Sequence, residues 1–208
     1  MNLDARRRFV TPVVLLAFAS AVFAQSAQEN AADAARLIQA LAIHEGTIVG
    51  EIGAGSGELT IAMAKAVGES GKVFSNELNK DRLKSIEAAA GKAGVTNVTP
   101  VEGRELETNF PDQCCDAIFM RNVYHHFGDP AAMDASLLKS LKPGGRLAVI
   151  DFTPPNEEAA TPDGRSKDGF HGVKAPTVER ELKAAGFEII SAETHNRGVF
   201  VVARRPTR

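Results

Sequence analysis

Residues 49–57 have the sequence Val-Gly-Glu-Ile-Gly-Ala-Gly-Ser-Gly, which is the segment most indicative of ligand binding in this chain. Glycine at every second position from Gly53 lets the backbone pass close to a ligand, because no Cβ stands in the way. A helix-like segment follows at 59–67, and the first turn of a helix carries backbone N–H groups without helical partners. The pattern predicts a strand, a turn and a helix that together hold a small polar cofactor.

The spacing of these glycines argues against two common nucleotide-binding loops. A dinucleotide fingerprint needs glycine where Glu58 stands, and a P-loop needs a Gly-Lys-Ser/Thr sequence that the segment lacks. Glu51 and Glu58 place negative charge on both sides of the loop, which contains no lysine. These charges would repel a triphosphate, so a ligand with a cationic or neutral end fits better.

A second carboxylate, Glu77, ends the next expected strand and lies 20 residues beyond Gly57. In α/β nucleotide folds an acidic residue at about this separation accepts hydrogen bonds from the ribose hydroxyls. Taken alone, Glu77 could equally be a solvated residue at a strand end. Together with the glycine loop it favours a nucleoside ligand.

The elements that must position these residues alternate between strands and helices. Helices are expected at 31–41, 59–67, 81–93, 131–141 and 177–185, with a turn at 142–145. Strands are expected at 48–52, 72–77, 98–101, 117–120 and 147–152, followed by a hairpin of 187–193 and 199–203. Several strands are apolar throughout, which indicates a parallel sheet covered on both faces. The expected fold is therefore α/β: a Rossmann-like, doubly wound, mostly parallel seven-stranded sheet with a C-terminal antiparallel hairpin.

Ligands of such sheets bind at the carboxyl ends of the strands. The glycine loop, Glu77, Gly103–Glu105 and Arg121–His126 all follow expected strand ends, so we expect them to meet in one crevice. The segment 153–175 follows the fifth strand and is rich in proline and glycine. It is expected to be a loop or lid that shapes an acceptor pocket, or else a surface insertion without such a role.

Three motifs resemble the signatures of the class I S-adenosylmethionine-dependent methyltransferases, of the type 11 and type 25 kind. They are Glu51-Ile-Gly-Ala-Gly-Ser-Gly57, the strand-end Glu77, and Leu141-Lys-Pro-Gly-Gly-Arg-Leu147. The resemblance runs from about Asp33 to the end of the sequence. The segment Asp116–Val123 is also similar to the ubiquinone/menaquinone C-methyltransferase branch, in which an Arg-Asn-Val segment ends the fourth strand.

The resemblance implies S-adenosyl-L-methionine as cofactor, with the glycine loop at its methionine end and Glu77 at its ribose. Leu78 would lie against the adenine. Arg104 stands where the family usually has an acid for the adenine amino group, so Glu105 is expected to substitute for it or the contact is lost. The cofactor-binding residues implied in this way are Glu51, Gly53, Ala54, Gly55, Gly57, Glu77, Leu78, Glu105 and Arg121.

Methyl transfer from a sulfonium asks the protein mainly to orient two reactants, exclude water and sometimes remove a proton. By resemblance, the segment after the fourth strand lines the transfer site. Asn122 is expected to hold the acceptor through its amide, and Tyr124 to place its ring near the sulfonium. His125 has a suitable ordinary pKa for a general base. His126 competes for that role, and either histidine could instead pack or cap.

The other potentially reactive side chains are not assigned a single catalytic role from the sequence. Asp151, at the end of the fifth strand, is expected either to orient the acceptor or to cap the loop. His171 and His195 lie in polar segments and are expected to be solvated. Cys114 and Cys115 are adjacent and are expected to be unreactive thiols. No cysteine or histidine spacing predicts a metal site, and none is expected.

Residues 1–24 read as a signal peptide, leaving 25–208 as the methyltransferase domain. Arg6–Arg8 form a basic region, Val13–Phe23 an apolar core, and Val22–Ala24 a small-residue cleavage site. The apolar stretch is shorter than a membrane-spanning helix of about 20 residues, so no stable membrane insertion is expected after cleavage. Export to the periplasm is expected, through the twin-arginine or the ordinary secretory route. An uncleaved anchor is the third alternative.

Composition limits the partners of the domain. Loss of three arginines and one aspartate with residues 1–24 moves the net charge from −2 to −4. With no tryptophan and one tyrosine, the chain has few base-stacking side chains, and no nucleic acid is expected as partner. The leading hypothesis is an exported methyltransferase for a small-molecule acceptor. The alternative is a non-catalytic binding or interaction module, because S-adenosylmethionine is made in the cytoplasm. A nicotinamide-dependent oxidoreductase is disfavoured by the glycine spacing, and the oligomeric state stays open.

Overall fold

A computed structural model describes the backbone of residues 13–208 and the side chains from Ser26 onward. Of the expected signal peptide, residues 1–12 lie outside the described residues, and 13–24 are described only as helix. The helices are α1 (Val13–Ala40), α2 (Glu58–Val67), α3 (Lys80–Ala93), α4 (Pro130–Ser140) and α5 (Ala175–Ala184), with short 3₁₀ turns η1 (Tyr124–His126) and η2 (Pro162–Gly164). The strands are β1 (Ile48–Ile52), β2 (Lys72–Glu77), β3 (Val98–Glu102), β4 (Cys115–Arg121), β5 (Leu141–Phe152), β6 (Glu188–His195) and β7 (Gly198–Arg204).

The strands form one seven-stranded sheet in the order β3-β2-β1-β4-β5-β7-β6. Strands β1 to β5 pair in parallel, and β7 pairs antiparallel with both β5 and β6. The expected α/β fold with its C-terminal antiparallel hairpin is confirmed. From β1 the chain first adds β2 and β3 on one side and then β4 and β5 on the other, so the strand order reverses between β1 and β4. In such sheets a crevice opens at the carboxyl ends of these two strands.

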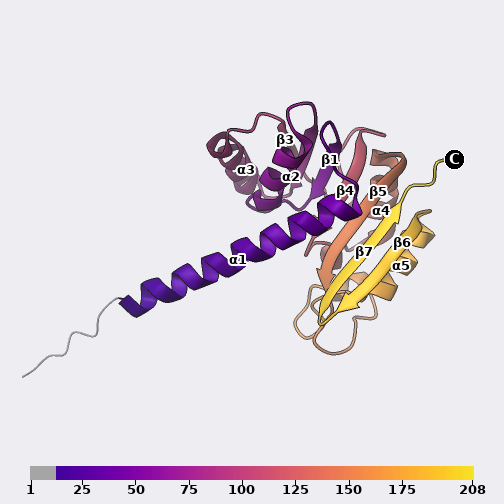
Figure 1. Cartoon of the computed structure of the whole chain (residues 1–208). Helices are drawn as coiled ribbons and strands as arrows, with labels where there is room; N and C mark the ends of the chain where they lie inside the picture. The colour runs from indigo at the N-terminus through magenta and orange to yellow at the C-terminus, as the bar shows by residue number, and fades with distance from the viewer. Residues whose placement is uncertain (1–12) are drawn as a thin grey trace, which may run out of the picture.

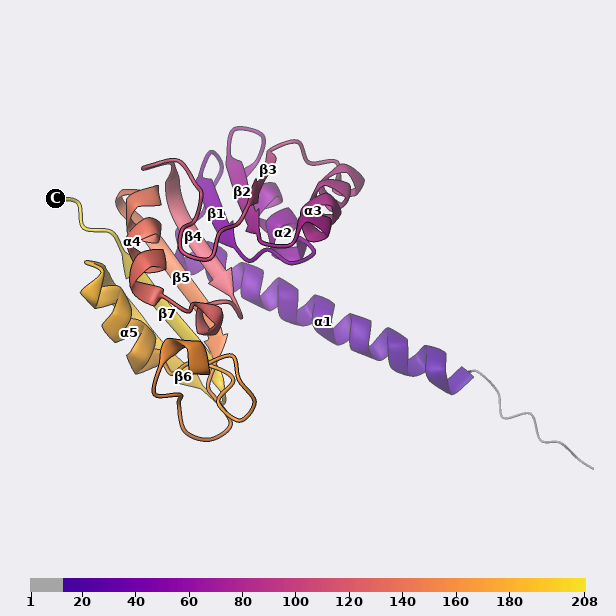
Figure 2. The same cartoon turned by 180° about the vertical axis from the view of Figure 1, so that it is seen from behind.

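Figures 1 and 2 show helices on both faces of the sheet, and an apolar core lies on each face. On one face α4 and α5 contribute Leu137 and Leu182 to a core under β4, β5 and β7. On the other face the C-terminal half of α1 and helix α2 contribute Leu37 and Met63. Because the central strands are buried on both sides, their sequences lack the polar alternation of a half-exposed strand.

Helix α1 is longer than the sequence indicates, because it begins at Val13 rather than at residue 31. Figure 1 shows its first half extending well away from the sheet, while its C-terminal end packs on it. In this packed C-terminal part of α1, the guanidinium carbon of Arg36 lies 3.7 Å from the centre of the Phe200 ring of β7. Across the described part of the chain, no helix is both long and apolar enough to span a bilayer.

The expected turn at 142–145 is wrong in detail, because β5 already begins at Leu141 and runs through this segment. Leu141 pairs with Cys115, and the register shifts before Ala117 pairs with Arg146. Gly144 has a φ of 78°, a backbone conformation that glycine adopts without a steric penalty. The Pro-Gly-Gly segment therefore bends the strand as an irregularity within the pairing and does not end it.

Candidate cofactor site

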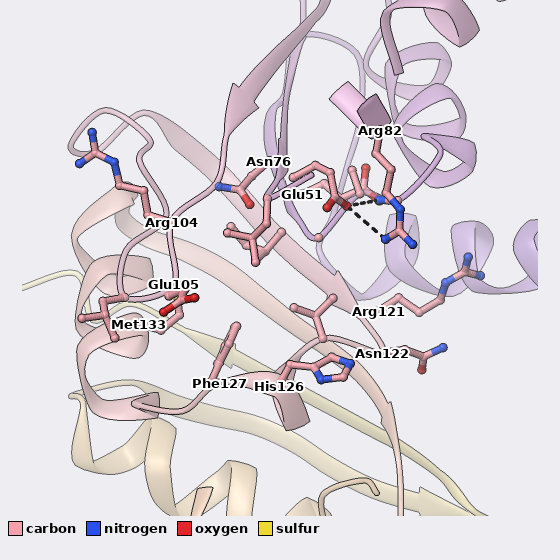
Figure 3. A pocket seen from close by; sticks show the side chains of 18 of the residues that line it. Glu51, Asn76, Arg82, Arg104, Glu105, Arg121, Asn122, His126, Phe127 and Met133 are labelled. Carbon is pink, nitrogen blue, oxygen red and sulfur yellow. Dashed lines mark hydrogen bonds and ion pairs between the residues drawn. The ribbon is translucent and has the colours of Figure 1, made fainter. Parts of the chain in front are cut away.

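A cavity of about 880 Å³ lies at the carboxyl ends of β1, β2 and β4. Most of its lining residues come from the ends of β1, β2 and β4, from the loops that follow β1 to β4, and from the first turns of α2, α3 and α4, and Figure 3 shows side chains from this lining. The crevice expected from the sequence is present. The loop after β1, Glu77 and the Arg104–Glu105 segment line this cavity, and so does part of the Arg121–His126 segment, namely Arg121–Val123 and His126.

The glycine loop presents bare backbone to the cavity. Gly53 and Gly55 have φ values of 68° and 60°, in the left-handed region. A Cβ on Gly53 would lie 2.4 Å from Cγ2 of Val123, so only glycine fits between this turn and the segment after β4. A Cβ on Gly55 would meet nothing within 4 Å, which leaves its backbone accessible. Gly57 does not line the cavity; it caps α2 with a φ of 91°.

Glu77 connects the end of β2 to this loop. Its Oε2 accepts a hydrogen bond of 2.9 Å from the Gly55 N–H, and its Oε1 accepts one of 3.0 Å from the Asn79 N–H. Arg82 lies 3.9 Å from the same carboxylate. The side chain of Glu77 is buried at the cavity wall. Each oxygen keeps a further lone pair for a ligand.

Glu51 is the buried acid at the start of the loop. Its Oε2 accepts a hydrogen bond of 2.5 Å from the hydroxyl of Thr60, which also contacts Ser75. Burial raises the pKa of Glu51 from 4.5 to about 8, and the charges of Glu58 and Glu77 act in the same direction. The Thr60 hydrogen bond and the charge of Arg121 oppose this rise of the pKa.

Two exposed leucines add apolar surface to the cavity wall. Leu78 is 59% exposed and Leu106 54% exposed, and both line the cavity. The family resemblance implied Leu78 but not Leu106, although Leu106 directly follows Glu105. Other lining residues that were not predicted from the sequence include Asn76, Arg82, Phe127, Met133 and Asp163. Arg82 could have been found from its position in the first turns of the helix after Glu77.

The charge of the cavity is mainly negative. Six acidic residues and three arginines line it, and no lysine occurs among the described lining residues. Arg121 faces away from the centre, because its guanidinium donates to Asn30 at 2.5 Å and to Asp33 at 3.0 Å. Figure 3 shows this side chain directed toward α1. Because α1 holds Arg121 at the rim, its positive charge offsets little of the negative charge of the acidic residues within the cavity.

The side chains of the segment after β4 point in different directions. Asn122 and His126 line the cavity, and Figure 3 shows the Asn122 amide pointing away from the centre. Tyr124 does not reach the cavity: it is fully buried, and its hydroxyl shares its one hydrogen between carboxylate oxygens of Asp134 at 2.8 Å and Glu181 at 3.1 Å. The expected contact of its ring with a sulfonium is therefore not supported by its position in the core.

His125 is also enclosed rather than open to the cavity. It is 1% exposed, and its Nδ1 lies 2.8 Å from Oδ1 of Asp151. The backbone N–H of His125 donates to the other oxygen of Asp151 at 3.2 Å. Its position does not support the general-base role, since the 3₁₀ turn η1 directs this ring inward. His126 lies at the cavity, and partial burial beside His125 and His171 lowers the pKa of its ring.

Comparison with known proteins gives the family. A family model described as a methyltransferase domain matches residues 43–193, well over half of the chain. The chain belongs to the class I S-adenosylmethionine-dependent methyltransferases. It is 32% identical over 117 residues to the ubiquinone/menaquinone biosynthesis C-methyltransferase of Marinomonas sp., which covers 56% of this chain and 47% of that protein. The chain thus spans about half the length of the curated relatives it matches.

Solved structures share the methyltransferase fold. A SAM-dependent methyltransferase from Aquifex aeolicus superposes with a TM-score of 0.70 at 24% identity, covering 83% of this chain and 89% of that one. Phosphoethanolamine N-methyltransferase 2 from Haemonchus contortus, solved in complex with S-adenosyl-L-methionine, gives a TM-score of 0.66 at 17% identity. It covers 81% of this chain and 52% of that chain.

The methyltransferase cavity fits S-adenosylmethionine, the cofactor of the family. The accessible Gly55 backbone suits a close-lying polar group, and the acidic residues that line the cavity suit a ligand with a cationic sulfonium and an amino group. The Glu77 carboxylate suits a ribose diol, and Leu78 and Leu106 suit a flat base. Of the nine residues implied by resemblance, eight line the cavity; they are Glu51, Gly53, Ala54, Gly55, Glu77, Leu78, Glu105 and Arg121.

Proposed function

We propose that the chain is an enzyme that transfers a methyl group from S-adenosylmethionine to a small-molecule acceptor. The observation that carries the proposal is that Gly55 and Glu77 are joined by a hydrogen bond and line the same cavity of about 880 Å³. This volume falls within the usual range of small-molecule sites, about 300–1,000 Å³. It supports a small acceptor beside the cofactor.

In this proposal Glu77 holds the ribose, and Leu78 and Leu106 enclose the base. When bound, S-adenosylmethionine supplies an electrophilic methyl group on a positively charged sulfur. His126 and Phe127 line the cavity beyond the glycine loop and are placed to contact the acceptor, whereas the amide of Asn122 points away from the centre. Neither Tyr124 nor His125 has a direct part in the reaction, because both are enclosed in the protein core.

Binding and turnover test the proposal together. Titration calorimetry should show saturable binding of S-adenosylmethionine, and a labelled methyl donor should transfer label to an acceptor in a pooled metabolite extract. Glu77→Ala should weaken binding about 10- to 100-fold, because hydrogen bonds to a charged group contribute about 1.5–3 kcal/mol. Glu102→Ala is the matched control, since this exposed acid ends the neighbouring strand and pairs with Lys80.

Loss of binding and loss of turnover would lead to different conclusions. Absence of binding, or equal binding by Glu77→Ala and the wild type, would refute the proposed cofactor site. Tight binding without turnover on any acceptor pool would refute catalysis and favour a binding module instead. A deletion strain compared with its parent by untargeted metabolite analysis would identify the acceptor.

We also propose that residues 1–24 direct export to the periplasm. The support is the order of a basic region, an apolar stretch and small residues before Gln25 in the sequence. Expression in a Gram-negative host followed by fractionation should recover the protein in the periplasm with Gln25 at its N-terminus. Recovery in the cytoplasm with residues 1–24 retained would contradict export.

A further inference from the structure

Three histidines from two distant segments meet beside the cofactor cavity. His125 and His126 belong to η1, and His171 comes from the loop between η2 and α5. The His125 ring centre lies 4.0 Å from that of His126 and 4.6 Å from that of His171. One ring nitrogen of each histidine lies within 4.8 Å of those of the other two. The chain therefore brings three imidazoles together at one point.

A buried carboxylate holds the His125 ring in an orientation suited to binding a metal ion. Asp151, which is 2% exposed, accepts hydrogen bonds from the Nδ1–H and from the backbone N–H of His125. With its proton on Nδ1, a neutral imidazole keeps its free electron pair on Nε2. That Nε2 is buried and has no hydrogen-bond partner among the described protein atoms. A carboxylate behind a histidine in this way fixes the ring and increases its basicity as a metal ligand.

We propose that His125, His126 and His171 bind a divalent transition-metal ion, and that zinc is the ion that fits best. Imidazole nitrogen suits zinc, copper and nickel, and three protein ligands with one open position are typical of catalytic zinc sites. Ligands about 2 Å from a tetrahedral metal lie about 3.4 Å from one another. His126 and His171 are both exposed, so their rings can rotate to close the remaining distance around the fixed ring of His125.

The site would join the loop before α5 to the wall of the cofactor cavity. His126 lines that cavity, whereas His171 lies in the segment 153–175, for which the sequence leaves a lid and a surface insertion as alternatives. Phe152 closes another side, with its ring centre 4.8 Å from that of His125 and 5.2 Å from that of His171. A bound ion would thus hold the loop in place and leave its open position near the cavity. Metal binding by these histidines would be independent of methyl transfer.

Zinc titration of the full chain without a histidine tag tests the site, with a chromophoric chelator as competitor. The wild type should bind one zinc ion per chain, and His171→Ala and His126→Ala should each bind it at least about 10-fold more weakly. His195→Ala is the matched control, because His195 is an exposed histidine of β6 outside the cluster. It should bind zinc like the wild type. Equal zinc affinity in the His126→Ala/His171→Ala double variant and the wild type would overturn the proposal.

A second measurement separates loss of the site from loss of the fold. Cobalt(II) in the wild type should give the visible absorption of a low-symmetry nitrogen site, and this band should disappear in His171→Ala. Asp151→Asn should keep the ligands but weaken zinc binding about 10- to 100-fold. Each variant should retain the circular dichroism spectrum of the wild type. A wild type that gives no cobalt band and binds no zinc, while it still binds S-adenosylmethionine, would refute the metal site and leave the proposed function intact.

Discussion

Glu51 is a carboxyl group whose proton affinity is set by its burial at the start of the glycine loop. It is 4% exposed, and burial is the largest of the influences that raise its pKa to about 8. Near neutral pH the group therefore holds a proton in the free protein. A cationic ligand in the cavity would favour its ionised form, so Glu51 couples ligand charge to protonation.

The raised pKa of Glu51 predicts that stability falls as pH rises from about 4.5 to about 8. Across this window the folded state binds more protons than the unfolded state, whose glutamate has the ordinary pKa of 4.5, so the free energy of unfolding decreases with pH. Glu51→Gln, which cannot ionise, should flatten this slope in urea unfolding measured over the window. Glu87→Gln in α3, an exposed glutamate away from Glu51, should keep it; an unchanged slope in Glu51→Gln would contradict the prediction.

At the scale of elements, the turn from β1 into α2 is fixed by contact with the segment after β4. Gly53 packs so closely on Val123 that a Cβ would lie 2.4 Å from its Cγ2. The left-handed φ of 68° adds strain for any other residue. The loop therefore owes its shape to a neighbour that is distant in the sequence as well as to its own glycines.

Gly53→Ala should lower stability by about 1–3 kcal/mol through overpacking and should also weaken S-adenosylmethionine binding. The additional change Val123→Ala should restore part of both losses, because it removes the atoms that the new Cβ meets. Gly91→Ala in α3 is the control: nothing lies within 4 Å of its Cβ position, and it should stabilise the helix by about 0.5–1 kcal/mol. Urea unfolding and calorimetry check both expectations. A harmless Gly53→Ala would contradict the packing argument.

The loop between β5 and α5 is anchored by a buried ion pair. Arg165 is 4% exposed, and its guanidinium donates to both oxygens of Glu181, at 2.9 Å and 2.5 Å. Glu181 also accepts from the Tyr124 hydroxyl, so the pair connects the loop, η1 and α5. The segment 153–175 is therefore an ordered loop, with Asp163 at the cavity.

Arg165→Ala should reduce stability by about 3–5 kcal/mol, because it leaves the carboxylate of Glu181 without its buried partner. Arg180→Ala is the control, since Arg180 is 68% exposed and lies 3.9 Å from the same carboxylate; its loss should change stability by less than about 1 kcal/mol. Urea unfolding gives both values, and limited proteolysis should cut the loop faster in Arg165→Ala. Equal effects of the two substitutions would contradict the anchoring role.

At the scale of the whole molecule, the cavity joins strand ends from both halves of the sheet, so a ligand there stabilises the folded chain as a unit. At 100 times its Kd, S-adenosylmethionine should add about 2.7 kcal/mol to the free energy of unfolding. For a domain of this size that corresponds to a Tm about 5–10 °C higher. Differential scanning fluorimetry checks this, and Glu77→Ala at the same concentration should show a clearly smaller shift. Equal shifts would place the ligand elsewhere.

Residue types and spacing were enough to predict the sheet and the cofactor half of the cavity. A parallel sheet places every strand's carboxyl end at one edge, so the glycine loop and Glu77 had to meet once their strands were recognised. The bend at Gly144 was not predictable in the same way. Whether Pro-Gly-Gly ends a strand or distorts it depends on pairing with β4, which lies elsewhere in the sequence.

The acceptor half shows what only the tertiary structure decided. In the sequence, Tyr124, His125 and His126 are equivalent neighbours after a strand, but η1 turns the first two into the core and leaves His126 at the cavity. His171 is far from them along the chain and reaches them because the loop is folded back by Arg165 and Glu181. Local sequence determined which backbone a cofactor can approach, whereas packing between distant segments determined which side chains surround the acceptor.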